Sequence, residues 1–244
     1  MIRATLVYLF IGLYVVLMAP IAVVWTLVTR DTAILYKMAR LAIRIAGWMC
    51  GVKVTVRGKE RIRSGYNYVF VSNHQGNFDA PVLLHVIPRD CRAIVKQEMM
   101  RIPVLSLLMK LVGFVPIERS RPARAHKSLE YGTRLLKQGR PFIAFPEGTR
   151  SRDGRLGPFK KGVFVMALKA GTPVAPVTIR GSREIQPPGT YAIRPGTVEV
   201  IFHEPIPTDR MTRQDADCLM ERTRCLIASG LEEMERLPRG LATG

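Results

Sequence analysis

The strongest constraint on this chain is an apolar run near its N-terminus. Residues 4–28 contain no charged side chain, with Arg3 before the run and Arg30 after it. As a helix the run would be about 37 Å long, longer than the roughly 30 Å hydrocarbon core of a bilayer. Pro20 lies inside it, so a kinked span and a re-entrant hairpin both stay open. The run predicts membrane insertion rather than a buried core helix or a cleaved signal peptide.

Residues 31–49 predict a second helix of a different kind. Apolar residues recur there at helical spacing, and basic residues occupy the other faces (Ile34, Leu35, Met38, Leu41, Ile45 and Trp48; Lys37, Arg40 and Arg44). Such a helix can lie in the headgroup layer of a membrane, or it can pack on the domain that follows. Positive charges after the apolar run place the main domain on the cytoplasmic side. We therefore expect a membrane-anchoring segment over residues 1–50 and an α/β domain over residues 51–244.

The charge balance points to a negatively charged partner. Lysine and arginine total 37 against 19 acidic residues, a formal charge of +18. Nucleic acid, a phosphate-bearing substrate and an anionic membrane face all fit such a balance. The mean hydropathy of +0.10 favours the membrane. A membrane-tethered nucleic-acid-binding protein is a weaker alternative, because aromatics are 7% of the chain and are not interleaved with the basic runs.

Beyond residue 50, apolar strands alternate with amphipathic helices. Strands are expected at residues 52–57, 68–72, 92–96, 114–117, 141–145, 174–179 and 198–202. Helices are expected from Asp79 as N-cap to residue 87, then at 99–111, 125–137 and 161–170, and from Thr212 with a capping box to Asp215. This order predicts an α/β fold with a mixed, largely parallel central sheet flanked by helices. The four cysteines are scattered, so neither a disulfide framework nor a metal site is expected.

A histidine and an aspartate follow the second of these strands. His74 comes directly after the strand, and Asp79 lies five residues further on, at the start of a helix. The imidazole can take a proton from a hydroxyl while the carboxylate holds its other nitrogen. General-base catalysis of this kind is worth roughly 10²–10⁴-fold in rate. The pair predicts an oriented base, although a solvated loop histidine would carry the same spacing.

Other strand ends carry candidate binding residues. The strand at residues 141–145 is followed by Glu147, Gly148, Thr149 and Arg150, which could hold phosphate and hydroxyl oxygens. Arg119 follows the strand at residues 114–117. Its guanidinium could form paired hydrogen bonds with a phosphate, or it could form an ion pair with Glu118. Lys96 ends the strand at residues 92–96 and is a further phosphate candidate. Since ligands of open α/β sheets bind beyond the carboxyl ends of strands, these groups are expected to converge.

These stretches resemble, in order and separation, the four motifs of the glycerolipid acyltransferase family. The matching segments are residues 73–79, 113–119, 145–151 and 174–179, and the resemblance covers roughly residues 50–210. Within that family the chain looks like the 1-acylglycerol-3-phosphate (lysophosphatidic acid) acyltransferases. In the second motif, Pro116 and Glu118 stand where the family often has an apolar residue and an aspartate.

The resemblance implies an enzyme and a reaction. A membrane-bound acyltransferase would move an acyl chain from acyl-CoA or acyl carrier protein to the sn-2 hydroxyl of lysophosphatidic acid, giving phosphatidic acid without a cofactor. The implied location is the cytoplasmic face of a bacterial inner membrane. His74 would be the base oriented by Asp79, and Pro176 would shape the pocket. The acceptor would be held by Arg119, Glu147, Gly148, Thr149 and Arg150, with Lys96 as an extra contact.

Two points stay open at this stage. The same acid–base pair would serve acylation of another acceptor, such as glycerol-3-phosphate, a lysophospholipid or a lyso-aminolipid. Backbone amides near the turn between His74 and Asp79 are candidate donors to the oxyanion of the intermediate.

Overall fold

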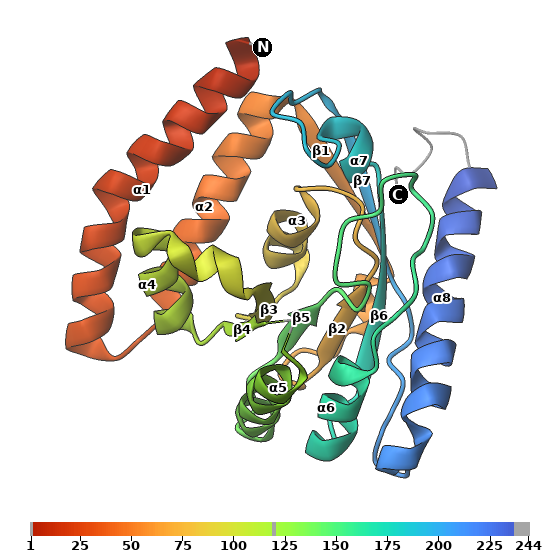
Figure 1. Cartoon of the computed structure of the whole chain (residues 1–244). Helices are drawn as coiled ribbons and strands as arrows, with labels where there is room; N and C mark the ends of the chain where they lie inside the picture. The colour runs from red at the N-terminus through yellow and green to blue at the C-terminus, as the bar shows by residue number, and fades with distance from the viewer. Residues whose placement is uncertain (1, 119–120, 237–244) are drawn as a thin grey trace.

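The computed structural model describes residues 2–118 and 121–236, and Figure 1 shows their arrangement. Two long helices open the chain, α1 (Ile2–Thr29) and α2 (Ala33–Cys50), and they pack side by side at one flank of the molecule. Pro20 lies within α1, which continues as one helix through it. The apolar run therefore forms one helix and not the re-entrant hairpin that the sequence left open.

The rest of the described chain is built on a seven-stranded sheet. The strands are β1 (Val52–Arg57), β2 (Val69–Ser72), β3 (Arg92–Lys96), β4 (Val115–Ile117), β5 (Phe142–Ala144), β6 (Val174–Arg180) and β7 (Gly196–Phe202). Their spatial order is β1-β7-β6-β2-β5-β3-β4. Every neighbouring pair is parallel except β6 and β7, which run antiparallel. The predicted mixed, largely parallel sheet is confirmed.

Helices cover both faces of this sheet. The α helices after α2 are α3 (Asp79–Val86), α4 (Pro103–Val112), α5 (Pro122–Lys137), α6 (Gly162–Ala170), α7 (Ser182–Ile185) and α8 (Ala216–Arg236). Short 3-10 turns are η1 (Lys59–Arg61), η2 (Gln97–Arg101) and η3 (Arg213–Asp215). In Figure 1, α3 lies between α2 and the sheet, and α8 lies against the opposite face.

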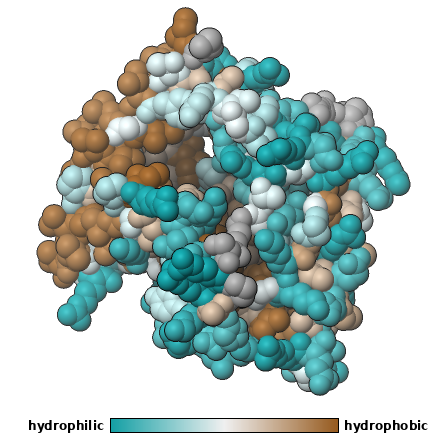
Figure 2. Space-filling model, viewed as in Figure 1, coloured by the Kyte–Doolittle hydropathy of each residue, from teal (hydrophilic) through white to brown (hydrophobic). Residues whose placement is uncertain are grey.

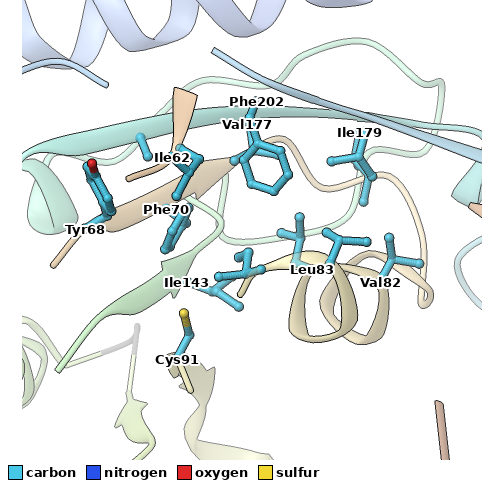
Figure 3. Close-up of a cluster of buried hydrophobic side chains, with 14 of the residues drawn as sticks. Ile62, Tyr68, Phe70, Val82, Leu83, Cys91, Ile143, Val177, Ile179 and Phe202 are labelled. Atoms are coloured by element: carbon cyan, nitrogen blue, oxygen red, sulfur yellow. The ribbon is translucent and has the colours of Figure 1, made fainter. Parts of the chain in front are cut away.

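The alternation of strand side chains builds one core on each face. In β2, Phe70 packs with the cluster on the α3 side, whereas Val69 and Val71 pack with the cluster under α5, α6 and α8. Figure 3 shows Leu83 of α3 facing the sheet residues Ile143 and Phe202 in the first cluster. Since β2 is buried on both faces, the loop that leaves its carboxyl end starts from a rigid position.

The helix α2 is fastened to the α/β part by hydrogen bonds as well as by apolar packing. The hydroxyl of Tyr36 donates to the carbonyl of Cys91 at 2.9 Å, and Nε of Arg40 donates to the carbonyl of Leu84 at 3.2 Å. One face of α2 therefore packs on the domain, which was one of the two expectations for this helix. Trp48, near its end, stays 82% exposed.

Most of the surface of α1 is not covered by any other part of the described chain. Among the described residues it is the one helix long and apolar enough to cross a membrane. Figure 2 shows hydrophobic side chains gathered over it, with a hydrophilic surface over much of the rest of this view and a hollow between the two. Its large exposed apolar residues include Leu6, Leu9, Leu13, Val16, Leu17, Ile21, Val24, Trp25, Leu27 and Val28.

One predicted helix begins later than expected. The helix predicted at residues 99–111 is a 3-10 turn over Gln97–Arg101 followed by α4, which starts at Pro103. Proline disfavours helical dihedrals in the residue before it, and Ile102 is indeed extended, so the helix cannot run through this point. Proline then suits the first helical turn, where a backbone N–H would have no partner.

Candidate active site

The candidate site lies in the loops that follow β2 and β5, which are neighbours in the sheet. β2 ends at Ser72, and His74 follows two residues later. β5 ends at Ala144 and is followed by the segment from Phe145 to Ser151. The two strands are parallel, so both segments leave the same edge of the sheet.

The predicted pair is in contact. Nδ1 of His74 lies 2.6 Å from Oδ2 of Asp79, and Asp79 is fully buried while the His74 side chain is 21% exposed. A carboxylate at that distance takes the Nδ1 proton of a neutral imidazole as a hydrogen bond. Nε2 is then left with its lone pair and can accept a proton.

The same carboxylate oxygen also organises the turn. Oδ2 of Asp79 accepts the backbone N–H of Gln75 at 2.6 Å and that of Gly76 at 2.8 Å. Oδ1 is buried and accepts no hydrogen bond within the described residues. These two amides are therefore already used by Asp79, which removes them from the expected donors to an oxyanion.

The expected N-cap role of Asp79 is corrected by the structure. Phe78 is the N-cap residue, and Asp79 is the first residue of α3. The aspartate bonds backwards, to amides outside the helix, because the chain folds tightly over it at Gly76. A Cβ at Gly76 would lie 2.7 Å from the carbonyl carbon and oxygen of Ser182, so only glycine fits this position without a shift.

The carboxylate of Glu147 is buried and accepts hydrogen bonds from two backbone N–H groups. Its Oε1 accepts the backbone N–H of His74 at 2.7 Å, and its Oε2 accepts that of Gly157 at 2.8 Å. The residue is 8% exposed. Burial raises the pKa of its carboxyl, and the N–H groups of His74 and Gly157 oppose that rise. Each carboxylate oxygen accepts a backbone N–H, so Glu147 holds the main chain of His74 in place, and the expected contact with an acceptor stays a prediction.

Further contacts that the sequence did not reveal hold His74 in place. The ring of Phe145 stacks on the imidazole at a centroid distance of 4.1 Å and an interplanar angle of 20°. The side chain of Asn73 bonds both backbone groups of Ile179 in β6, at 2.8 Å each. The N–H of Ser151 donates to the carbonyl of His74 at 2.7 Å. Asn73 is thus tied to β6, and His74 itself to the loop after β5.

The remaining residues of the loop after β5 lie around the dyad. Nη1 of Arg150 donates to Oδ1 of Asn77, which lies between His74 and Asp79 in sequence. Thr149 is exposed, and Gly148 is buried with a φ of 75°, a backbone conformation that favours glycine. The guanidinium of Arg150 therefore lies beside the turn between His74 and Asp79.

Two other predicted residues, Lys96 and Pro176, stand apart from this cluster. Lys96 ends β3 with its side chain 57% exposed, and it pairs with Glu98 at 3.2 Å. Arg119 lies outside the described residues. Pro176 is buried inside β6 opposite Val71, so it supports the sheet below the site rather than lining an open pocket.

A groove of about 760 Å³ runs beside the site. It is lined by Gln75, by the loop from Asp153 to Leu156 and by the end of α8, but not by His74 or Asp79. The dyad itself lies outside that groove. Among the described residues, no group of three or more histidine, cysteine or acidic side chains is placed to hold a metal ion.

Comparison with known proteins fits this geometry. A family model described as Acyltransferase matches residues 53–180, just over half of the chain and the part that carries β2, β5 and both loops. The chain belongs to the acyltransferase family. The resemblance drawn from the four motifs is thereby confirmed at the level of the family.

Relatives of this acyltransferase have names that agree with one another. A chloroplastic 1-acyl-sn-glycerol-3-phosphate acyltransferase of Brassica napus is 39% identical over 181 residues, which cover 73% of this chain and 51% of the relative. The human 1-acyl-sn-glycerol-3-phosphate acyltransferase alpha is 30% identical over 205 residues, 84% of this chain and 72% of the relative. The chain spans about half the length of the plant relatives from Brassica napus and Arabidopsis thaliana.

A solved structure is similar over almost the whole chain. The crystal structure of PlsC, the 1-acyl-sn-glycerophosphate (LPA) acyltransferase of Thermotoga maritima, superposes with a TM-score of 0.85 at 28% identity. The match covers 97% of this acyltransferase and 96% of PlsC. The N-terminal helices are therefore part of the shared architecture.

Proposed function

We propose that this chain transfers an acyl group from a thioester, of CoA or of acyl carrier protein, to the sn-2 hydroxyl of lysophosphatidic acid. The product is phosphatidic acid. The observation that carries the proposal is the 2.6 Å contact between His74 Nδ1 and Asp79 Oδ2 beneath Arg150. The shared names of the relatives support the choice of acceptor.

The base acts through its free nitrogen. Asp79 holds the proton on Nδ1, so Nε2 of His74 removes the proton of the acceptor hydroxyl. Phe145 keeps the imidazole plane fixed by stacking on it, and Glu147 keeps its backbone fixed. As the imidazole gains its proton, the buried carboxylate of Asp79 stabilises the positive charge.

The acyl group moves in one direct transfer. The hydroxyl oxygen attacks the thioester carbonyl carbon, which forms the new C–O bond and places negative charge on the carbonyl oxygen. The C–S bond then breaks, and the thiolate takes the proton from Nε2 of His74. Atoms, charge and the state of His74 are restored at the end of the cycle, so no covalent acyl-enzyme is required.

Arg150 is assigned to the phosphate of the acceptor. A guanidinium forms paired hydrogen bonds with phosphate oxygens, and Arg150 lies beside the turn that carries His74. This places the phosphate near the base, as the sn-2 hydroxyl requires, since only the glycerol backbone separates the two groups. Thr149 and Lys96 are further candidates at the same edge of the sheet, and Arg119 remains a candidate by motif.

The exposed apolar surface of α1 supports a place at the membrane. Both the acceptor and the product are lipids, and a helix with so many uncovered apolar side chains is stable in contact with lipid. The basic residues after α1 favour the cytoplasmic face. We extend the proposal to a membrane-bound enzyme with His74 on that side.

The direct test is acyl transfer by purified protein in detergent micelles. Lysophosphatidic acid is supplied with either acyl-CoA or acyl carrier protein, and the wild type is compared with His74→Ala. We expect the variant to lose at least about a hundredfold in rate. Lysophosphatidylcholine and glycerol-3-phosphate in parallel reactions report which acceptor is preferred.

His126→Ala is the matched control. His126 is an exposed histidine that pairs with Glu130 in α5, away from the site, so its loss should leave the rate unchanged. Transfer by His74→Ala at the rate of the wild type would rule out the base, and a preference for glycerol-3-phosphate would rule out the acceptor.

A further inference from the structure

A second polar pocket lies at the opposite edge of the sheet, where β3 and β5 begin. Its volume is about 430 Å³. Within the described part of the chain, its charged lining consists of four arginines and one aspartate (Arg40, Arg89, Arg92, Arg140 and Asp90). His74 follows the carboxyl end of β2, so this arginine pocket is separate from the candidate active site.

Most of the positive charge in the arginine pocket has no carboxylate beside it. Nη1 of Arg40 pairs with Oδ1 of Asp90 at 2.9 Å. Arg89 donates to the carbonyl of Gly65 at 2.5 Å, which satisfies a donor but cancels no formal charge. The side chain of Arg140 is exposed and makes no hydrogen bond or ion pair within the described residues, while its backbone N–H donates to the carbonyl of Leu135 at 3.1 Å. Three guanidinium groups are therefore uncompensated.

Arg92 is the buried member of this group. It is 8% exposed, and its Nη1 donates to the carbonyl of Asp90 at 3.2 Å, while its Nε is buried with no acceptor among the described residues. Burial lowers the pKa of Arg92, and the positive charge of Arg140 acts in the same direction. Asp90 opposes this lowering but forms no ion pair with Arg92, and an anion in the pocket would further offset the cost of burying the guanidinium.

We propose that the arginine pocket binds a phosphate group, carried either by a lipid headgroup or by a free phosphate compound. Guanidinium groups match phosphate oxygens in geometry and stay charged at any physiological pH. Arg40 belongs to α2, whereas Arg92 begins β3 and Arg140 precedes β5. A phosphate held between them would therefore tie α2 to the α/β domain.

The test measures thermal stabilisation by phosphate. All variants carry Arg150→Gln, so that the acceptor site does not contribute, and potassium chloride of equal ionic strength is the reference. At ten times the dissociation constant of inorganic phosphate, we expect the melting temperature of this parent to rise by about 3–6 °C. Adding Arg89→Gln and Arg140→Gln should weaken phosphate binding about tenfold or more.

Two further variants make the result specific. Lys53→Gln with Arg210→Gln removes the same charge from exposed positions elsewhere and should keep the full shift. Arg140→Gln alone should weaken binding without a folding defect, because the substitution keeps the backbone N–H bonded to Leu135 and the side chain of Arg140 makes no hydrogen bond or ion pair within the described residues. An absent shift in the parent, or an unchanged dissociation constant in both pocket variants, would overturn the proposal.

Nanodiscs identify the source of the phosphate. If a lipid headgroup occupies the pocket, nanodiscs of phosphatidylcholine with phosphatidylglycerol should stabilise the parent more than nanodiscs of phosphatidylcholine alone. That difference should then disappear in the Arg89→Gln, Arg140→Gln variant. If a free compound occupies it, both nanodiscs should give equal melting temperatures and added inorganic phosphate should raise them. Stabilisation by neither overturns the proposal.

Discussion

Glu147 accepts the backbone N–H of His74 at 2.7 Å, so the loop after β5 holds the main chain of the proposed base. The second oxygen of the same carboxylate holds Gly157, ten residues further along the chain. One buried side chain thus fixes the two loops relative to each other. Mutations there should act on His74 without touching substrate.

Glu147→Gln tests this positioning role. The amide offers one acceptor where the carboxylate offers two, so one backbone N–H, of His74 or of Gly157, loses its partner. We expect kcat to fall about tenfold or more and the free energy of unfolding to fall by about 1–3 kcal/mol. Steady-state kinetics and thermal denaturation measure the two effects.

Glu130→Gln serves as the control for that change, because Glu130 lies on the surface of α5 and pairs only with His126 among the described residues. A rise in the KM for lysophosphatidic acid with an unchanged kcat would instead return Glu147 to the role of a substrate contact.

Asp79→Asn separates charge from geometry. Oδ2 of Asp79 accepts all three of its hydrogen bonds and Oδ1 accepts none, so an asparagine oxygen at the Oδ2 position can keep all three. The turn should stay folded while the negative charge under His74 is lost. We expect kcat to fall at least about a hundredfold. A kcat close to that of the wild type would mean that the charge has no part in catalysis.

Arg150→Gln should act mainly on acceptor binding. Removing a guanidinium that contacts phosphate costs about 1.5–3 kcal/mol, so we expect the KM for lysophosphatidic acid to rise about tenfold or more with little change in kcat. Monoacylglycerol, which lacks the phosphate, is the matched substrate and should be affected much less. Equal losses with both acceptors would contradict the assignment.

His203 predicts an acid-sensitive fold. Thr178 donates its hydroxyl proton to the carbonyl of Ile227 at 3.1 Å, so Nε2 of His203, 2.8 Å away, is the donor to Thr178. Burial lowers the pKa of His203 from 6.5 to about 4. Between pH 6.5 and pH 4, His203 binds a proton in the unfolded chain but not in the folded chain. The free energy of unfolding therefore falls as the pH falls.

The size of this effect is up to about 3 kcal/mol between pH 6.5 and pH 4. Thermal denaturation across that range should give a smaller decline for His203→Gln than for the wild type. His126→Gln, at an exposed histidine, should decline as the wild type does. Identical pH profiles for wild type and His203→Gln would show that this histidine does not drive the loss.

Local patterns were enough to predict most elements. The strands over Val52–Arg57 and Arg92–Lys96 have the bounds that alternation and apolar runs predicted, and the Thr212–Asp215 capping box is present. The order of strands was not predictable, because β7 lies between β1 and β6 through pairings that join distant parts of the chain. No local signal encodes such a choice.

The candidate site, too, has features that the sequence could predict and features that it could not. His74 and Asp79 are five residues apart at a strand end, so their contact could be predicted from spacing and turn geometry. The role of Glu147 could not, because its partners His74 and Gly157 meet it only after β2 and β5 pair. A carboxylate beside an arginine in a loop gives the same sequence pattern whether it faces a ligand or a backbone amide.

The uncovered side of α1 changes how the rate of this enzyme has to be expressed. In the membrane-bound enzyme proposed above, a helix with so much apolar surface would carry a belt of lipid or detergent, and lysophosphatidic acid would partition into the same belt. Encounters would then take place in two dimensions, and the relevant concentration would be the mole fraction of acceptor within the bilayer or micelle. Adding inert detergent at constant total substrate should slow the reaction by surface dilution, although the bulk molarity of every reactant is unchanged.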